Sequence, residues 1–267
     1  MLRRTEEVLD WKGRAIVCKR CAHLRLQKKD LCRIGHACVK DRQPARIEEF
    51  FEINPDQANV YLSDEYFEIR AAAVRHADTV HLTALLNDPD DTVRWNAALR
   101  LPRRFLLRLR NDPDREVRIR VANHIEGEEL VPMMSDPDYY VRQVVAHRIE
   151  VSLLRFMLDD PDPQVRLTVA GRIEASWLGG LARDPEDEVR LAVARRYAPQ
   201  QLASLRTDPD CRVRHEVASR APLSVLQRMK DDEDMVVRQI VVARLESERS
   251  SLGDGHVLLR MPTGTRD

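Results

Sequence analysis

An aspartate returns every 24 residues through most of this 267-residue chain. Proline follows six of these aspartates, an acidic residue stands two positions after all of them except Asp64, and an arginine stands six positions after each. The series runs Asp64, Asp88, Asp112, Asp136, Asp160, Asp184, Asp208 and Asp232. A period this strict indicates one structural unit copied about eight times and stacked, because so small a unit cannot bury its apolar face alone.

The apolar positions of the repeat predict one helix followed by a shorter one. With the aspartate counted as position 1, apolar residues recur at positions 6, 10, 11 and 14. This spacing places them on one face of a helix about ten residues long. A second apolar pair with a spacing of three follows, as at Leu154 and Met157, and such a short element fits a 3₁₀-helix. No segment has the alternation of a β-strand, so the sequence predicts an all-α solenoid.

The polar residues of the repeat have structural interpretations. The aspartate before proline fits the N-cap of the helix, the proline its first position, and the second acid a first-turn carboxylate. The arginine at position 7 is expected to pair with aspartates of a neighbouring repeat, as a ladder along the stack. An anion-binding stripe is the alternative interpretation of these arginines.

The organisation of the chain follows from where the repeat holds. Residues 64–250 form the repeat array, and residues 47–63 are a linker or a degenerate repeat. Ser250 and Gly253 stand where leucines are expected, so residues 251–267 are predicted to be a frayed or capping tail. Residues 1–46 form a separate domain that is rich in cysteine and in basic residues.

Charge is divided unequally between these parts. The whole chain has 44 basic and 44 acidic side chains, but residues 1–46 carry 13 lysines and arginines against five acids. The array is therefore acidic, which argues against nonspecific binding of nucleic acid along its length. The basic head is either a solvated surface or a docking surface for an acidic protein or nucleic acid. The chain has no long apolar run and no signal-peptide core near its start, so a soluble, cytoplasmic protein without a membrane partner is expected.

Four of the five cysteines predict a metal site in the head. Cys18, Cys21, Cys32 and Cys38 form the pattern C-x₂-C-x₁₀-C-x₅-C. Clustered cysteines in an intracellular protein are typical of metal ligands, and four thiolates suit either Zn²⁺ or an iron–sulfur cluster. His23 and His36 are weaker alternative ligands, and the isolated Cys211 is expected to be an incidental exposed thiol.

The head and the array together resemble the leucine-rich repeat variant proteins. The matching repeat signature is D-P-D-x-x-V-R-x-x-V-A, found at Asp112 to Ala122 and at Asp160 to Ala170. The resemblance covers nearly the whole chain. It implies a right-handed superhelix of alternating α- and 3₁₀-helices, and one [4Fe–4S] cluster bound by Cys18, Cys21, Cys32 and Cys38. Asp64 lacks its proline and Glu233 replaces proline in the last copy, so only the ends of the array depart from the pattern.

Three functions are compatible with the sequence. The first is a non-enzymatic solenoid that binds a partner protein and carries a structural or redox-sensing [4Fe–4S] cluster. The second is an electron carrier that docks a redox enzyme. The third is a nucleic-acid-binding protein with a zinc head. The chain contains no Walker loop, no G-x-S-x-G and no H-E-x-x-H motif, so it is not predicted to be an enzyme.

Overall fold

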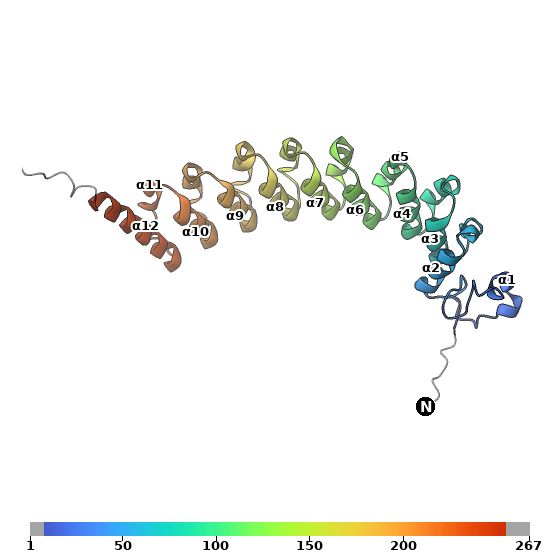
Figure 1. The fold of residues 1–267 in the computed structure, drawn as a ribbon. Coiled ribbons are helices and arrows are strands. Elements are labelled where there is room, and N and C mark those ends of the chain that lie inside the picture. Colours follow the sequence, from blue (N-terminus) through green and yellow to red (C-terminus); the bar gives the residue numbers. More distant parts are fainter. Residues whose placement is uncertain (1–7, 255–267) are drawn as a thin grey trace, which may run out of the picture. The chain divides into compact units, whose positions relative to one another are not determined.

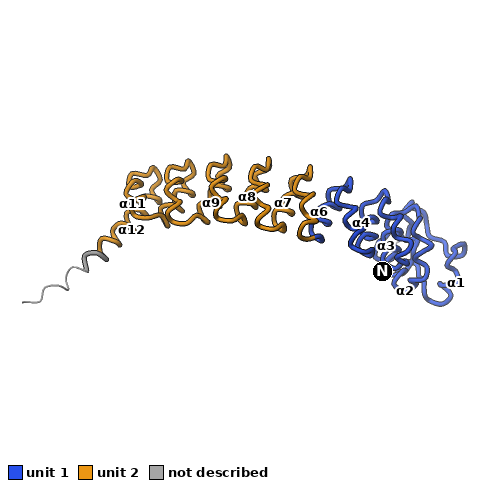
Figure 2. Tube along the Cα trace, turned by 90° about the horizontal axis from the view of Figure 1, so that it is seen from above, with its two compact units in different colours: residues 1–125 blue, residues 126–267 orange. Residues whose placement is uncertain are grey.

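The computed structural model describes residues 8–254 of the chain. These residues fall into two compact units, with the boundary between Ile125 and Glu126 (Figure 2). Both units consist of helices joined by short turns, and residues 8–254 contain no β-strand, only the isolated bridges Leu9–Ala15 and Arg33–Ala37. The predicted all-α solenoid is therefore confirmed. Within the same residues, no helix is both long enough and apolar enough to cross a membrane.

The first unit contains the cysteine-rich segment and the first repeats. Its α-helices and 3₁₀-helices (η) are η1 Cys18–Arg20, α1 Leu24–Gln27, α2 Pro44–Ile53, η2 Pro55–Tyr61, α3 Phe67–His76, η3 Thr79–Asn87, α4 Asp91–Arg100, α5 Arg103–Leu106, η4 Leu107–Asn111 and α6 Arg115–His124. The pair α2–η2 has the same order as each repeat and packs against α3.

The second unit continues the same alternation. Its elements are η5 Gly127–Ser135, α7 Tyr139–Arg148, η6 Val151–Met157, α8 Pro163–Arg172, η7 Ala175–Leu181, α9 Asp187–Arg196, η8 Pro199–Leu205, α10 Cys211–Arg220, α11 Leu223–Leu226 and α12 Met235–Asp254. Figure 1 shows α7, α8, α9 and α10 side by side, with the short helices along the opposite edge of the row. The helix of ten residues and the 3₁₀ character of the second element are both as predicted.

The core of each repeat consists of the periodic apolar side chains. In the repeat of α7, Val141, Val145 and Ile149 are fully buried, and Leu154 of η6 is fully buried as well. Burying a side chain of this size contributes about 1.5–3 kcal/mol. Because each repeat presents this face to its neighbours, the stack has one continuous apolar interior within each unit.

The helix N-caps differ from the prediction. The second acid of the repeat, not the first, is the cap: Asp90 accepts hydrogen bonds from the backbone N–H groups of Thr92 (3.0 Å) and Val93 (3.2 Å). Asp114, Asp138, Asp162 and Asp210 occupy the same place in their repeats. The prediction for the first aspartate was wrong, because the proline lies before the helix and the helix begins only at position 4. Each such cap is worth about 1 kcal/mol.

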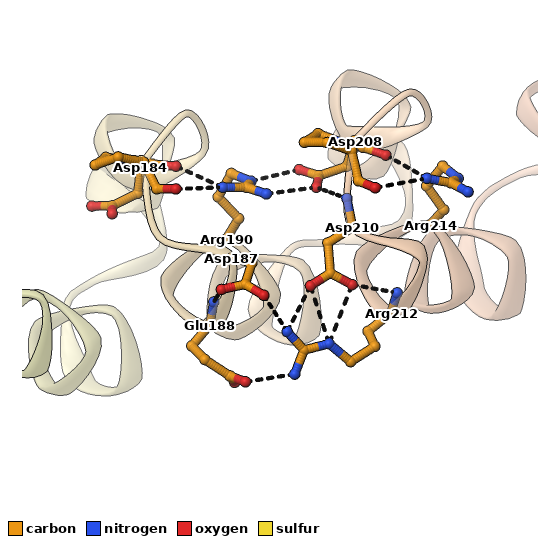
Figure 3. A network of polar contacts seen from close by, with 10 residues as sticks. Asp184, Asp187, Glu188, Arg190, Asp208, Asp210, Arg212 and Arg214 are labelled. Atoms are coloured by element: carbon orange, nitrogen blue, oxygen red, sulfur yellow. Dashed lines mark hydrogen bonds and ion pairs between the residues drawn. The ribbon is translucent and has the colours of Figure 1, made fainter.

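The first aspartate instead receives the arginine of the preceding repeat. Arg190 donates from Nε and Nη2 to the two carboxylate oxygens of Asp208, at 2.8 and 2.9 Å, and from Nη1 to the carbonyl oxygen of Asp184 at 2.9 Å (Figure 3). Equivalent pairs are Arg70–Asp88, Arg94–Asp112, Arg142–Asp160, Arg166–Asp184 and Arg214–Asp232. The expected ladder is confirmed, and its guanidinium groups are committed to it rather than to an anion-binding stripe.

A second arginine series, which the sequence analysis missed, stands at position 13. Arg196 donates to the carbonyl oxygens of Ala170 (2.7 Å) and Ile173 (2.6 Å), near the C-terminus of the preceding helix α8. Arg100, Arg172, Arg220 and Arg244 make the same contacts. Carbonyl groups at a helix C-terminus lack partners within the helix and carry partial negative charge. In these repeats, a cation supplied by the next repeat therefore binds the last carbonyl groups of the helix, whereas position 13 of the repeat that begins at Asp112 is His124.

The last copy of the repeat ends as one long helix. Helix α12 runs without a break from Met235 to Asp254. The second apolar pair that produces a turn in the other repeats is replaced by Ser250 and Gly253, so nothing folds the chain back. Apart from the backbone of α12, the predicted tail at 251–267 lies outside the described residues.

Acid is expected to weaken the array through the aspartates of the ladder. Burial alone would raise the pKa of Asp184, but hydrogen bonds from Arg166 and from the backbone of Glu186 outweigh it and hold the pKa below its usual 3.8. A carboxyl group whose pKa is lowered by folding stabilises the fold above its unfolded pKa, and this stability is lost as the pH falls through the folded pKa. The urea midpoint of the protein should therefore fall as the pH drops below about 4.

The Asp184→Asn variant tests this assignment, because its side chain does not titrate. We expect it to be less stable than the wild type at neutral pH and to converge with the wild type in acid. Parallel pH profiles for the two proteins would contradict a contribution from Asp184.

Candidate metal centre

The four clustered cysteines occupy two different environments. Cys18 begins the short helix η1 and Cys21 follows it, with the backbone N–H of Cys21 bonded to the carbonyl oxygen of Cys18 at 3.0 Å. Both side chains are half-buried. Cys32 and Cys38 are only 5 % and 3 % exposed. One pair of thiols is therefore shielded from water, and the other pair lies near the surface.

The four thiols are close enough to influence one another electrostatically. Cys32 donates a hydrogen bond to the sulfur of Cys38, which raises the pKa of Cys32 and lowers the pKa of Cys38 to about 7. Burial raises the pKa of Cys18, and the neighbouring Cys38 and Cys21 raise it further. Mutual repulsion of this kind is relieved when a metal centre binds the thiolates. The sequence-predicted ligands are therefore gathered in one region of the fold.

Hydrogen bonds from α2 and η2 hold the chain beside three of the cysteines. The buried side-chain amide of Asn54, the C-cap of α2, donates to the carbonyl oxygen of Leu31 at 2.8 Å, next to Cys32. The backbone N–H of Cys38 donates to the carbonyl oxygen of Arg46 at 3.0 Å. The ring Nε2 of His23, two residues after Cys21, is hydrogen-bonded to the hydroxyl of Tyr61.

His23 belongs to an aromatic group that joins the head to these helices. Its ring lies 5.0 Å from that of Phe50 and 5.7 Å from that of Tyr61, and Phe50 contacts Phe51 edge-on at 5.3 Å. Burial lowers the pKa of His23, as does Lys40. A buried, hydrogen-bonded imidazole of this kind has a structural role, and His36, the other alternative ligand, is exposed.

Two further contacts fix the ends of the head. The fully buried carboxylate of Asp41 accepts from Arg46 at 3.2 Å and from the backbone N–H of Gln43 at 3.0 Å. Near the start of the described residues, Trp11 stacks on Tyr66 with the ring centres 5.3 Å apart. The head therefore packs on α2 and on the start of α3, as well as on η2.

The donor set suits an iron–sulfur centre in its chemistry. Four thiols lie in one region, two of them are shielded from water, and exposed cations such as Lys19, Arg20 and Lys40 stand beside them. A cubane cluster takes four thiolates of this kind, one at each iron.

Comparison with solved structures identifies the family to which this chain belongs. A structure described as a leucine-rich repeat variant with a novel repetitive protein structural motif aligns with a TM-score of 0.77 and 40% sequence identity. The alignment covers 86% of this chain and 98% of that one. The chain belongs to the leucine-rich repeat variant family.

The N-terminal part of this leucine-rich repeat variant matches a family of its own. The family model described as the LRV protein FeS4 cluster matches residues 8–60, which include all four clustered cysteines. A protein of Rhodobacter capsulatus, described as an uncharacterized 27.7 kDa protein in the nifB 3′ region, is 44% identical over 96 residues. That match covers 36% of this chain and 39% of the relative's length. The protein is thus an iron–sulfur repeat protein.

Sequence reasoning found the cysteines of the leucine-rich repeat variant but missed the residues that support them. Asn54 and Tyr61 fall in the segment 47–63, which carries neither the full repeat pattern nor the cysteine pattern. The asparagine just before Pro55 could have indicated a residue that ends a helix, because asparagine is common at the ends of helices. Nothing in the sequence indicated that its partner would be Leu31.

Proposed function

We propose that this leucine-rich repeat variant is a non-enzymatic interaction protein of the cytoplasm. Its [4Fe–4S] cluster, bound by Cys18, Cys21, Cys32 and Cys38, controls the order of the N-terminal end of the solenoid that binds a partner protein. The observation that carries this proposal is the attachment of the chain beside three of these cysteines to α2 and η2.

The head has too little core to be stable without its cluster. Its helices η1 and α1 are three and four residues long. Among residues 8–43, the buried apolar side chains are Cys32, Ala37, Cys38 and Val39. A domain this small depends on a metal or another cross-link for stability, and the free energy of ligation is then free energy of folding.

The structural effect of losing the cluster would extend beyond the head. Without it, Asn54 and Tyr61 lose the partners that the head presents to them, and the apolar end of the repeat array loses its cover. Terminal repeats of a solenoid need such a cap to stay ordered and soluble. Loss of the cluster therefore reduces the order of α2, η2 and the neighbouring α3. This coupling is the physical basis of a sensing role.

Hydrogen exchange tests this coupling without a known partner. Removing the cluster with a chelator should increase amide exchange in residues 44–61 about tenfold or more, because local opening no longer costs the contacts to the head. Exchange in α7 to α10 should stay the same and serves as the internal control. Equal exchange of α2 and η2 in the loaded and stripped protein would contradict the proposed role of the cluster.

Electron transfer is the second candidate function. It is favoured by the half-exposed position of Cys18 and Cys21, which would bring one edge of a bound cluster near the surface. A redox titration followed by electron paramagnetic resonance tests it. A reversible one-electron couple supports this function, whereas breakdown of the cluster on reduction removes it.

A further inference from the structure

We propose that an acidic protein docks at the edge of the head where the cluster comes nearest to solvent. This basic edge is defined by Val17, Lys19, Arg20 and Lys40. The inference rests on the proposed cluster and names the chemistry of the partner and the surface that it uses. This surface lies on the head and not on the acidic array.

The position of the edge follows from the exposure of the cysteines. Cys32 and Cys38 are buried, whereas Cys18 and Cys21 are half-buried. The half-buried pair flanks Lys19 and Arg20 of η1, and both of these side chains are exposed. A molecule that touches η1 therefore stands as close to a bound cluster as the fold allows.

The edge has an excess of unneutralised positive charge. Residues 8–43 contain ten lysines and arginines against three acids. Each of the three acids is already paired, in Asp10–Arg14, Asp30–Arg33 and Asp41–Arg46. A [4Fe–4S] centre with four thiolates carries only about two negative charges when oxidised, so the surroundings stay positive. Lys19, Arg20 and Lys40 have no ion-pair partner in the part of the chain that the structure describes.

An apolar side chain within this basic edge favours a protein over a nucleic acid. Val17, the N-cap residue of η1, is 57 % exposed. Protein interfaces combine an apolar centre with a charged rim, whereas single-stranded nucleic acid is bound by cations together with aromatic platforms for its bases. The exposed aromatic residue of the head, Trp11, is already stacked on Tyr66, with Lys12 over its ring.

A surface of this size and charge fits a transient complex. Interfaces of a few cations around a small apolar centre lie at the low end of the size range and give weak, short-lived complexes. Their charges chiefly accelerate association, and salt screens them. The partner is therefore expected to bind quickly at low ionic strength and to be released by salt.

The test measures binding of a glutamate–tyrosine copolymer to the full-length, cluster-loaded protein at low ionic strength. The copolymer offers carboxylates and apolar groups together, and an oligo-dT of matched charge offers phosphates. We expect the copolymer to bind more tightly than oligo-dT. The double variant Lys19→Glu/Arg20→Glu should weaken copolymer binding about tenfold or more, because attraction becomes repulsion. Val17→Ser should weaken binding of the copolymer about threefold and leave that of oligo-dT unchanged.

The matched control is Arg228→Glu/Lys230→Glu, which makes the same change in charge at two exposed residues of the second unit. It should bind the copolymer as the wild type does. Unchanged binding by the Lys19→Glu/Arg20→Glu variant would overturn the proposal, and so would oligo-dT binding that equals or exceeds that of the copolymer. The wild type could instead self-associate at low salt, and the Lys19→Glu/Arg20→Glu variant could abolish this association. That result would mean that the partner is a second copy of the chain and not another acidic protein.

Iron and sulfide analysis of every sample, made before the binding measurement, separates the two hypotheses. Wild-type protein without iron contradicts the proposed function itself. Protein with full iron content that fails the binding test contradicts only the docking surface.

Discussion

Replacing Cys32 with serine is expected to remove iron from the protein. The wild type, purified without oxygen, should contain about four irons and four sulfides per chain and absorb near 400 nm. The variant should contain less than about one iron, because a serine hydroxyl does not ionise readily and three thiolates do not complete the set. Cys32 gives the most decisive test, because its side chain is buried and a ligand from solvent cannot easily take its place. Metal analysis and the absorption spectrum provide the measurement.

Cys211→Ser is the matched control for this substitution. It makes the same chemical change at an exposed thiol at the start of α10, far along the chain from the head, and should keep full iron content. Full iron in the Cys32→Ser variant would exclude Cys32 from the ligands, and the same measurement applies to Cys18, Cys21 and Cys38. One zinc and no sulfide in the wild type would instead support the zinc-headed alternative and end the redox hypotheses.

Replacing Arg190 with alanine should destabilise the protein by about 3 kcal/mol, because removing one partner of a buried ion pair leaves the other charge uncompensated. Arg190 and Asp208 are 8 % and 7 % exposed. The same change also leaves the carbonyl oxygens of Asp184 and Pro185 without their donor. Urea unfolding, followed by circular dichroism, measures the loss.

The exposed Arg212 provides the comparison within the same repeats. It bonds with Asp187, Glu188 and Asp210 at the surface (Figure 3), where solvent and salt screen each pair. Arg212→Ala should leave the urea midpoint nearly unchanged. Similar midpoints for Arg190→Ala and Arg212→Ala would mean that burial of the ladder does not determine its contribution.

The sequence predicted the repeat architecture because the repeat averages out local ambiguity. One copy of the pattern around Val141 is compatible with several folds, but eight copies in register define the helix, its buried face and the partner of Arg142. The cap was assigned wrongly because two acids stand two residues apart, as at Asp160 and Asp162, and either fits an N-cap by type. The bond between Arg142 and Asp160 decides between them, and that contact lies between repeats.

The structure of the head was predicted less completely because its sequence contains no repeated pattern. The cysteine spacing identified the donor type and was compatible with both zinc and an iron–sulfur cluster, and the family match favours the cluster. The contacts that support the cysteines, from Asn54 to Leu31 and from His23 to Tyr61, join segments 23 and 38 residues apart. Each occurs once, so no pattern in a single sequence reveals it.

The two arginine series have a consequence for how such an array can change in length. In a repeat with both arginines, such as that of Arg190 and Arg196, one reaches forward to an aspartate 18 residues ahead, and the other reaches back to carbonyl groups 26 and 23 residues behind. Internal repeats with both arginines therefore present the same donors and acceptors to both neighbours, whereas the repeat that begins at Asp112 has His124 at position 13. Gain or loss of one complete repeat between two such repeats restores every bond across the new junction, whereas an insertion of any other length leaves buried charge unpaired on both sides. The same bonds that stabilise the stack thus allow it to lengthen or shorten only by whole repeats.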